Sequence, residues 1–177
     1  MPYPLPVKKS SLNKYSTLTI VLIALAFLAG CAAGPNAETR TINQVTDGVE
    51  GQSEAIKVRN FTLVTGEDGS GVVVATLVNQ DEASDEVLAI TINGQQANLG
   101  YLGKSATSLA LTNRTPLTFS GPSANAYAYI TDLGAKAGYR VPVRVELAKS
   151  GVINLDVLIR EQSGDFAEVT IPESATR

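Results

Sequence analysis

From residue 55 onward, apolar and polar residues alternate in short segments that predict β-strands. Residues 56–63 alternate with a period of two, as expected for a half-buried strand. Residues 72–78 are β-branched and largely apolar, which predicts a strand covered on both faces. Residues 87–92 form another such segment, and Asn93-Gly94 after it is a strong signal for a tight turn. The first half of this region is therefore predicted to consist of strands connected by turns.

The second half continues the pattern with further short segments, at residues 109–111, 117–119, 126–131, 141–147 and 152–159. Pro142 indicates either a sheet edge or the start of a strand. No stretch after residue 31 keeps helical periodicity over three turns. Short strands separated by turns at intervals of about 8–12 residues predict an all-β fold, an immunoglobulin-like, two-sheet antiparallel sandwich.

The first thirty residues follow a different pattern. A polar segment with three lysines precedes an apolar run, LTIVLIALAFL, which ends in Leu28-Ala29-Gly30-Cys31. This run is shorter than the roughly 20 residues of a transmembrane helix and is typical of a signal peptide, whose core is helical. Small residues before a cysteine predict cleavage before Cys31 and attachment of lipid, including palmitate, to its thiol. The alternatives are an ordinary signal peptide with an incidental cysteine, and an uncleaved anchor.

These patterns divide the chain into four parts. Residues 1–30 are predicted to be a lipoprotein signal peptide, and residues 31–53, rich in small and polar residues, a lipidated flexible tether. The sandwich is expected over residues 54–172, with a tail at 173–177. Lipid on Cys31 would hold the domain on the extracytoplasmic face of the cell membrane.

The composition limits the chemistry of the chain. It has no histidine, no tryptophan and one cysteine, and its one methionine is Met1. Serine–histidine triads, cysteine–histidine pairs, histidine metal sites and intrachain disulfides are therefore excluded. Removing the first thirty residues leaves 11 basic and 17 acidic residues, a net charge of −6, which argues against a nucleic-acid partner.

Carboxylates are the remaining candidates for site chemistry. Glu67 and Asp68, together with the acidic loop at 81–86, offer oxygen ligands of the kind that calcium prefers, although their spacing is not that of an EF-hand. Paired carboxylates also serve as acid and base in hydrolases. The favoured interpretation is that both segments are solvated turns at the ends of the sheets, and that the protein has no cofactor.

Two segments resemble a known family. Residues 133–143, LGAKAGYRVPV, and 145–153, VELAKSGVI, are similar to the end of the PCuAC periplasmic copper chaperones, and the strands at 73–79 and 86–93 fit the start of that family. Within it, the chain is most similar to the actinobacterial LpqE-type lipoproteins. The resemblance spans about residues 55–160. It implies a cupredoxin-like sandwich and a copper site made of two histidines and two methionines.

The chain departs from the family at the copper ligands. The last ligand pair, a His-x-Met, falls where this sequence has Tyr127-Ala128-Tyr129. Both tyrosines should lie on one face of a strand, but phenol oxygens are poor ligands for soft Cu(I). We therefore expect no metal site of the family type. Tyr127 and Tyr129 become candidates for a partner surface, in a patch with Tyr101 and Tyr139, unless the four rings fill the core.

The sequence thus predicts a membrane-anchored extracytoplasmic lipoprotein that is not an enzyme. It would act as a binding or accessory module of the cell envelope, with another envelope protein as its partner. The alternative function is a metal (copper) chaperone-like protein with a degenerate or rearranged site of carboxylates and tyrosines. A third hypothesis is a hydrolase that uses carboxylates.

Overall fold

The computed structural model describes residues 48–170. The predicted signal peptide, Cys31 and the tether up to residue 47 lie outside the described residues, as do residues 171–177. Within the described part, no helix is long and apolar enough to cross a membrane.

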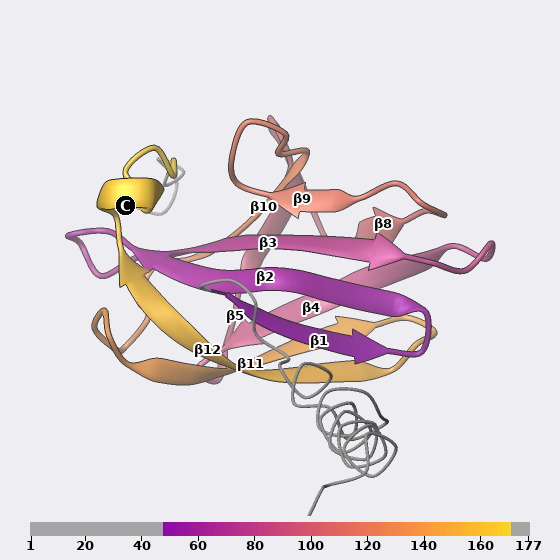
Figure 1. Cartoon of the computed structure of the whole chain (residues 1–177), viewed down its shortest axis with the longest axis horizontal. Coiled ribbons are helices and arrows are strands. Elements are labelled where there is room, and N and C mark those ends of the chain that lie inside the picture. The colour runs from indigo at the N-terminus through magenta and orange to yellow at the C-terminus, as the bar shows by residue number, and fades with distance from the viewer. Residues whose placement is uncertain (1–47, 171–177) are drawn as a thin grey trace, which may run out of the picture. The chain divides into compact units, whose positions relative to one another are not determined.

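The regular secondary structure of the described chain is almost entirely β-strand (Figure 1). A short 3₁₀ helix, η1 (Gly164–Phe166), follows the last strand. The strands are β1 (Val49–Ser53), β2 (Ile56–Thr65), β3 (Gly71–Asn79), β4 (Asp85–Ile92), β5 (Gln95–Gln96), β6 (Asn98–Tyr101), β7 (Lys104–Ala106), β8 (Leu109–Leu111), β9 (Leu117–Phe119), β10 (Ala126–Ile130), β11 (Arg140–Leu147) and β12 (Val152–Glu161).

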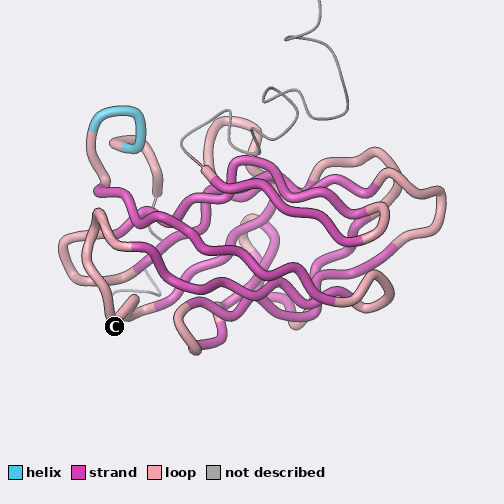
Figure 2. The backbone as a smooth tube through the Cα atoms, turned by 60° about the horizontal axis from the view of Figure 1, so that its bottom comes forward, coloured by secondary structure: helices cyan, strands magenta, loops and turns pink. Residues whose placement is uncertain are grey.

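The strands form one continuous sheet that curls into two layers. Its hydrogen-bonded order is β5-β4-β11-β12-β2-β3-β9-β10-β6-β7, with β1 paired to β2 and β8 paired to β4. β12 joins the layers, because residues 152–158 pair with β11 and residues 159–161 pair with β2. Figure 2 shows the strands running along the domain, with loops gathered at its ends. The prediction of an all-β, cupredoxin-like sandwich is confirmed.

The sequence suggested an antiparallel sandwich, but two of the strand pairs are parallel. β12 pairs with β2 in the parallel sense, and β10 pairs with β9 in parallel at Ala126 and Phe119. After the β11–β12 hairpin, β12 crosses to the second layer, and there it runs in the same direction as β2. A parallel pair needs a long connection, and here the chain from β2 to β12 supplies it.

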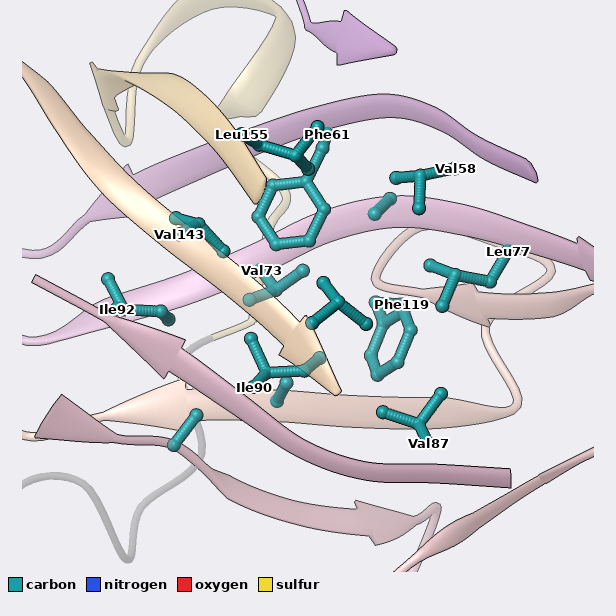
Figure 3. Close-up of a cluster of buried hydrophobic side chains, with 14 of the residues drawn as sticks. Val58, Phe61, Val73, Leu77, Val87, Ile90, Ile92, Phe119, Val143 and Leu155 are labelled. Carbon is teal, nitrogen blue, oxygen red and sulfur yellow. The ribbon is translucent and has the colours of Figure 1, made fainter. Parts of the chain in front are cut away.

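The core lies between the two layers (Figure 3). Alternate residues of the strands point inward, as the burial of Val141, Val143, Val145 and Leu147 in β11 shows. Burial of one such side chain contributes roughly 1.5–3 kcal/mol. Pairs of inward residues from both layers thus hold the sandwich together, among them Val58, Phe61, Val73, Leu77, Val87, Ile90, Ile92 and Phe119.

Pro142 lies inside a sheet and not at its edge, since β11 is flanked by β4 and β12. It is the second residue of its strand, so the alternative of a strand start holds. Pairing with β4 begins one residue later, at Val143, and the Pro142 carbonyl accepts a hydrogen bond from the Asn93 N–H at 2.9 Å. The proline has no N–H to donate in return, so the ladder with β4 starts with this single hydrogen bond.

The end of the predicted tether is a strand. Val49–Ser53, assigned to the tether from composition, form β1 and pair with β2, so the sandwich begins before residue 54. The Gly48 N–H donates to the Asn60 side-chain oxygen at 3.0 Å. Gly51 lets the backbone approach β12, because a Cβ there would lie 2.6 Å from a methyl carbon of Leu155. Backbone pairing and the close approach at Gly51 hold this polar segment in the sheet. Neither produces a pattern of apolar residues, so the sequence pattern did not predict this strand.

Residues 95–106 contain three strands that the sequence did not predict, β5, β6 and β7. They are two to four residues long and carry few large apolar side chains. The tight turn before them is confirmed, since Asn93 and Gly94 have φ values of 48° and 82°.

Candidate functional site

The two candidate tyrosines lie on the outer face of β10. Ala126, Ala128 and Ile130 of this strand point into the core, so Tyr127 and Tyr129 point away from it. Their ring centroids are 5.8 Å apart. The expectation that the two rings share one face is therefore correct.

Tyr127 is held in one orientation by the neighbouring strand. It pairs with Gly100 of β6, and a Cβ at Gly100 would lie 2.3 Å from the phenol oxygen. The ring thus lies over the glycine, and its hydroxyl donates to the Ser105 hydroxyl of β7 at 3.2 Å. Glycine at this position is required because any larger side chain would displace the ring.

Tyr129 is mostly buried and offers little surface to a partner. Only 7% of it is exposed, and it packs with Val64, Val72 and Val169 in a small cluster outside the main core. Phe166 and Tyr127 pack against the same cluster. The interpretation that tyrosines fill a core thus applies to Tyr129, although this core is a second one on the outer face of the sheet.

The other two tyrosines do not extend this pair into one patch. The Tyr101 hydroxyl accepts a hydrogen bond from the Ala110 N–H at 2.7 Å. Tyr139 is 66% exposed, but it lies before β11, and its carbonyl accepts from the Ile159 N–H of β12. Tyr127 is therefore the tyrosine around which a site can be built.

The segment after β12 covers the outer face of the sheet. We call residues 164–170 the C-terminal strap. Val169 of the strap is buried against Val72 and Tyr129, and its carbonyl accepts a hydrogen bond from the Gln162 side-chain amide at 2.7 Å. Figure 1 shows this segment at one end of the domain, beyond β12. The sequence analysis placed this segment within the sandwich domain at residues 54–172 and predicted no element or contact for it. The isolated apolar residues Phe166 and Val169 are the signal that could have found it.

A pocket of about 660 Å³ lies between Tyr127 and the strap. We call it the Tyr127 pocket. Its volume falls in the range of small-molecule and anchor-residue sites, about 300–1,000 Å³. Its walls are the turn between β6 and β7, the loop after β9, and β3, β10 and the strap. The lining residues are Val72, Leu102, Gly103, Ser120, Gly121, Pro122, Ala124, Ala126, Tyr127, Asp165, Glu168, Val169 and Thr170.

Most of the lining is apolar, and its charged side chains lie only on the strap. Leu102 is 64% exposed and is the most exposed large aliphatic side chain among the described residues. Asp165 and Glu168 are also exposed and bring two carboxylates to the pocket, whereas none of the lining residues is basic. The arrangement can bury an apolar group and hold a neutral or positive charge next to it.

The residues present do not fit copper. Tyr127 and Tyr129 occupy the positions where the resemblance places the last histidine and methionine, and the whole chain has no histidine. Among the described residues, no group of three histidine, cysteine, aspartate or glutamate side chains converges. Phenols without nitrogen or sulfur ligands do not form a site for Cu(I).

The two acidic segments do not combine into a calcium site either. They lie at opposite ends of β3, whose nine residues span about 30 Å. In the first segment, the Asp68 carboxylate accepts from the hydroxyl and the N–H of Ser70, at 2.6 and 3.0 Å. The hydrogen bond from the Ser70 hydroxyl lowers the pKa of Asp68. This carboxylate closes a turn, as the favoured interpretation expected.

Asp85, at the other end, is 4% exposed and joins the start of β4 to the β11–β12 turn. Its carboxylate accepts from the Lys149 and Ser150 N–H groups at 2.9 and 3.0 Å, and from the Ser150 hydroxyl at 2.7 Å. It also accepts from the N–H of Glu86. Burial raises the pKa of Asp85, but these hydrogen bonds outweigh it, so the pKa lies below its ordinary value.

Comparisons with known proteins identify the fold. No protein-family model and no curated protein sequence matches the chain. Among solved structures, it is similar to a copper-bound PCuAC domain from PmoF2, with 12% identity, a TM-score of 0.56, and coverage of 63% of this chain and 97% of that one. An apo PCuAC domain from PmoF1 gives 19% identity and a TM-score of 0.55, with coverage of 63% and 98%. The domain therefore has the β-sandwich fold of PCuAC domains.

Proposed function

We propose that this protein is a lipid-anchored binding module on the extracytoplasmic face of the cell membrane, of the LpqE type, and that its partner is another envelope protein. The proposal assigns it no enzymatic activity. The lysines, apolar run and cysteine at residues 1–31 support the anchor. The absence of histidine supports a binding role, since most activated serine and cysteine nucleophiles depend on it.

The observation that carries the binding role is the Tyr127 pocket. It combines an apolar interior with Leu102, an exposed aliphatic side chain, at its edge. Protein interfaces gain most of their energy where an anchor side chain fills such a pocket and water is excluded. Tyr127 is already held by Gly100 and Ser105, so its ring loses little freedom when a partner binds.

The lipid would keep this pocket close to the membrane. Residues 32–47 separate Cys31 from the first described residue, and a fully extended chain of that length spans at most about 55 Å. The domain therefore begins within that distance of the membrane surface, and a partner must reach it there. Confinement raises the effective concentration of the pocket for a partner in the same membrane.

Replacing Cys31 tests the anchor. In its own host, the wild-type protein should fractionate with membranes and incorporate an azide-labelled palmitate analogue. Cys31→Ser should lose the label. Retention of the label in Cys31→Ser would contradict lipidation at this residue.

Photocrosslinking on intact cells tests the binding surface. A benzoylphenylalanine in place of Leu102 should give a discrete crosslinked product with one envelope protein. The control position is Leu88, which is 43% exposed on β4 and does not line the Tyr127 pocket. Identical products from both positions would contradict a binding role for the pocket, and turnover of a substrate by the purified protein would contradict the absence of activity.

One observation favours metal handling as a second candidate function, namely the shared fold with a copper-bound domain. The donor set argues against it, as described above. Calorimetry of the purified chain with Cu(I), Cu(II), Zn(II) and Ca(II) separates the two functions. We expect no binding tighter than millimolar, and submicromolar binding of any of the four ions would favour metal handling.

A further inference from the structure

The Tyr127 pocket has charge on one side only. Asp165 and Glu168 both lie on the C-terminal strap, and no lysine or arginine is among the lining residues. A ligand that enters the pocket therefore meets two negative charges beside an apolar wall. Such a site disfavours anionic groups, including fatty-acid carboxylates and lipid phosphates, and favours cations.

The two carboxylates are held at defined positions by the strap. The backbone of the strap closes on itself, since the Val169 N–H donates to the Phe166 carbonyl at 3.1 Å. Val169 of the strap is buried against Val72 and Tyr129, and the Gln162 side-chain amide donates to its carbonyl. The carboxylates thus project from a short segment that follows β12 and is held by Val169, which keeps their charge beside the pocket and makes it a specificity element.

We infer that the Tyr127 pocket binds an apolar side chain of a partner protein that is flanked by lysine or arginine. This inference rests on the proposed function, in that the partner is a protein. The apolar side chain would lie against Val72 and Tyr127, and the basic groups would face Asp165 and Glu168. Because the carboxylates are exposed, their contribution depends on ionic strength and acts mainly on the choice between partners.

Three synthetic peptides test the inference on the full, lipidated chain in phosphatidylcholine nanodiscs. They share one central phenylalanine in a glycine–serine background, flanked by lysines, by serines or by glutamates. Fluorescence polarisation measures each dissociation constant. We expect the lysine peptide to bind about tenfold more tightly than the glutamate peptide, with the serine peptide between them. A lysine peptide with alanine at the centre should bind at least tenfold more weakly than its phenylalanine counterpart.

Two double variants separate local from general electrostatics. Asp165→Lys with Glu168→Lys should reverse the order of the peptides. Glu54→Lys with Glu82→Lys changes the net charge by the same amount at exposed positions outside the pocket, next to the β1–β2 turn and after β3, and should keep the order. High salt should reduce the difference in affinity between the lysine and glutamate peptides in all variants.

Several results would overturn the inference. One is equal binding of the three charged and neutral peptides to the wild type, and another is the same reversal in both double variants. Displacement of all peptides by a neutral fatty alcohol, without any dependence on flanking charge, would assign the pocket to lipid. The peptide measurements do not use the crosslinked partner, and the Cys31→Ser and crosslinking experiments do not use the peptides. Failure of the inference is therefore distinguishable from failure of the proposed function.

Discussion

The two ends of β3 differ in how their surroundings are packed. Beyond Asn79, the chain gathers around Asp85, whose carboxylate accepts hydrogen bonds from β4 and from the β11–β12 hairpin. Near Val72, at the start of the strand, the sheet instead carries the Tyr127 pocket. At the Asp85 end, polar groups find their partners inside the domain. At the Val72 end, an apolar volume is left that no side chain of residues 48–170 fills.

This difference separates residues that stabilise the domain from residues that are available for a ligand. Removing a group at the Asp85 end leaves buried donors without an acceptor, which lowers stability. Removing a group at the edge of the pocket exposes little that was buried, so binding should change while stability does not. The following predictions test this separation in order of the expected change in the free energy of unfolding.

Asp85→Ala should cause the largest loss. Without the carboxylate, the N–H groups of Lys149 and Ser150 and the Ser150 hydroxyl lose their acceptor. We expect a decrease of about 3 kcal/mol in the free energy of unfolding. Urea denaturation at neutral pH measures it. Asp85→Asn keeps one acceptor oxygen and should lose less, whereas equal losses would show that the hydrogen bonds are not the cause.

Stability should also fall in acid because of the same carboxylate. The pKa of Asp85 in the folded protein lies below its ordinary value of 3.8, so its contribution is present above that value and is lost as the pH falls through the folded pKa. Urea denaturation between about pH 5 and pH 3 should show a steeper loss for the wild type than for Asp85→Asn. Parallel curves for the two proteins would contradict this assignment.

Val169→Ala should lower the free energy of unfolding by less, about 1 kcal/mol, because this strap valine packs in the small outer cluster and not in the main core. The neighbouring Thr170 is exposed, so Thr170→Ala is the matched control and should change stability very little. Hydrogen exchange at the Val169 amide should accelerate in Val169→Ala. An effect as large as that of Asp85→Ala would mean that the strap is part of the main cooperative core.

Leu102→Asp should change stability least, within about 0.5 kcal/mol, since the side chain is 64% exposed. It should nevertheless weaken peptide binding at the pocket by more than tenfold, because it removes apolar contact at the edge. Fluorescence polarisation and urea denaturation on the same sample measure both quantities. Leu88→Asp on β4 is the control, and equal losses of binding in both variants would remove the distinction between the pocket and the rest of the surface.

Most of the strands were predictable because their apolar residues alternate. β2, β3, β4, β11 and β12 contain the runs of valine, isoleucine and leucine from which the sequence analysis started, and the Asn93-Gly94 turn was read from its residue types. β1 and β6 escaped prediction because backbone pairing and close approaches at Gly51 and Gly100 hold them. A glycine contact depends on what lies opposite, which a linear pattern does not contain.

The candidate site was predictable only in part. The spacing of Tyr127 and Tyr129 determined that they share a face, but the burial of Tyr129 depends on Val64, Val72 and Val169, which come from three distant segments. Leu102 and the strap carboxylates lie near Tyr127 only because the sheet curls and the chain after β12 folds back over it.

The sequence by itself determined the chemistry that this protein lacks and the class of its fold. Without histidine, and with Met1 as its one methionine, it excludes the copper ligands of the family it resembles, and its alternating strands predict a sandwich. Only the tertiary structure decided which surface remains open. Packing at the Asp85 end satisfies buried polar groups, whereas Gly100, the strap and the β6–β7 turn leave a gap beside Tyr127. A cavity arises from the mismatch between elements far apart in the chain, so it has no signature in any one of them.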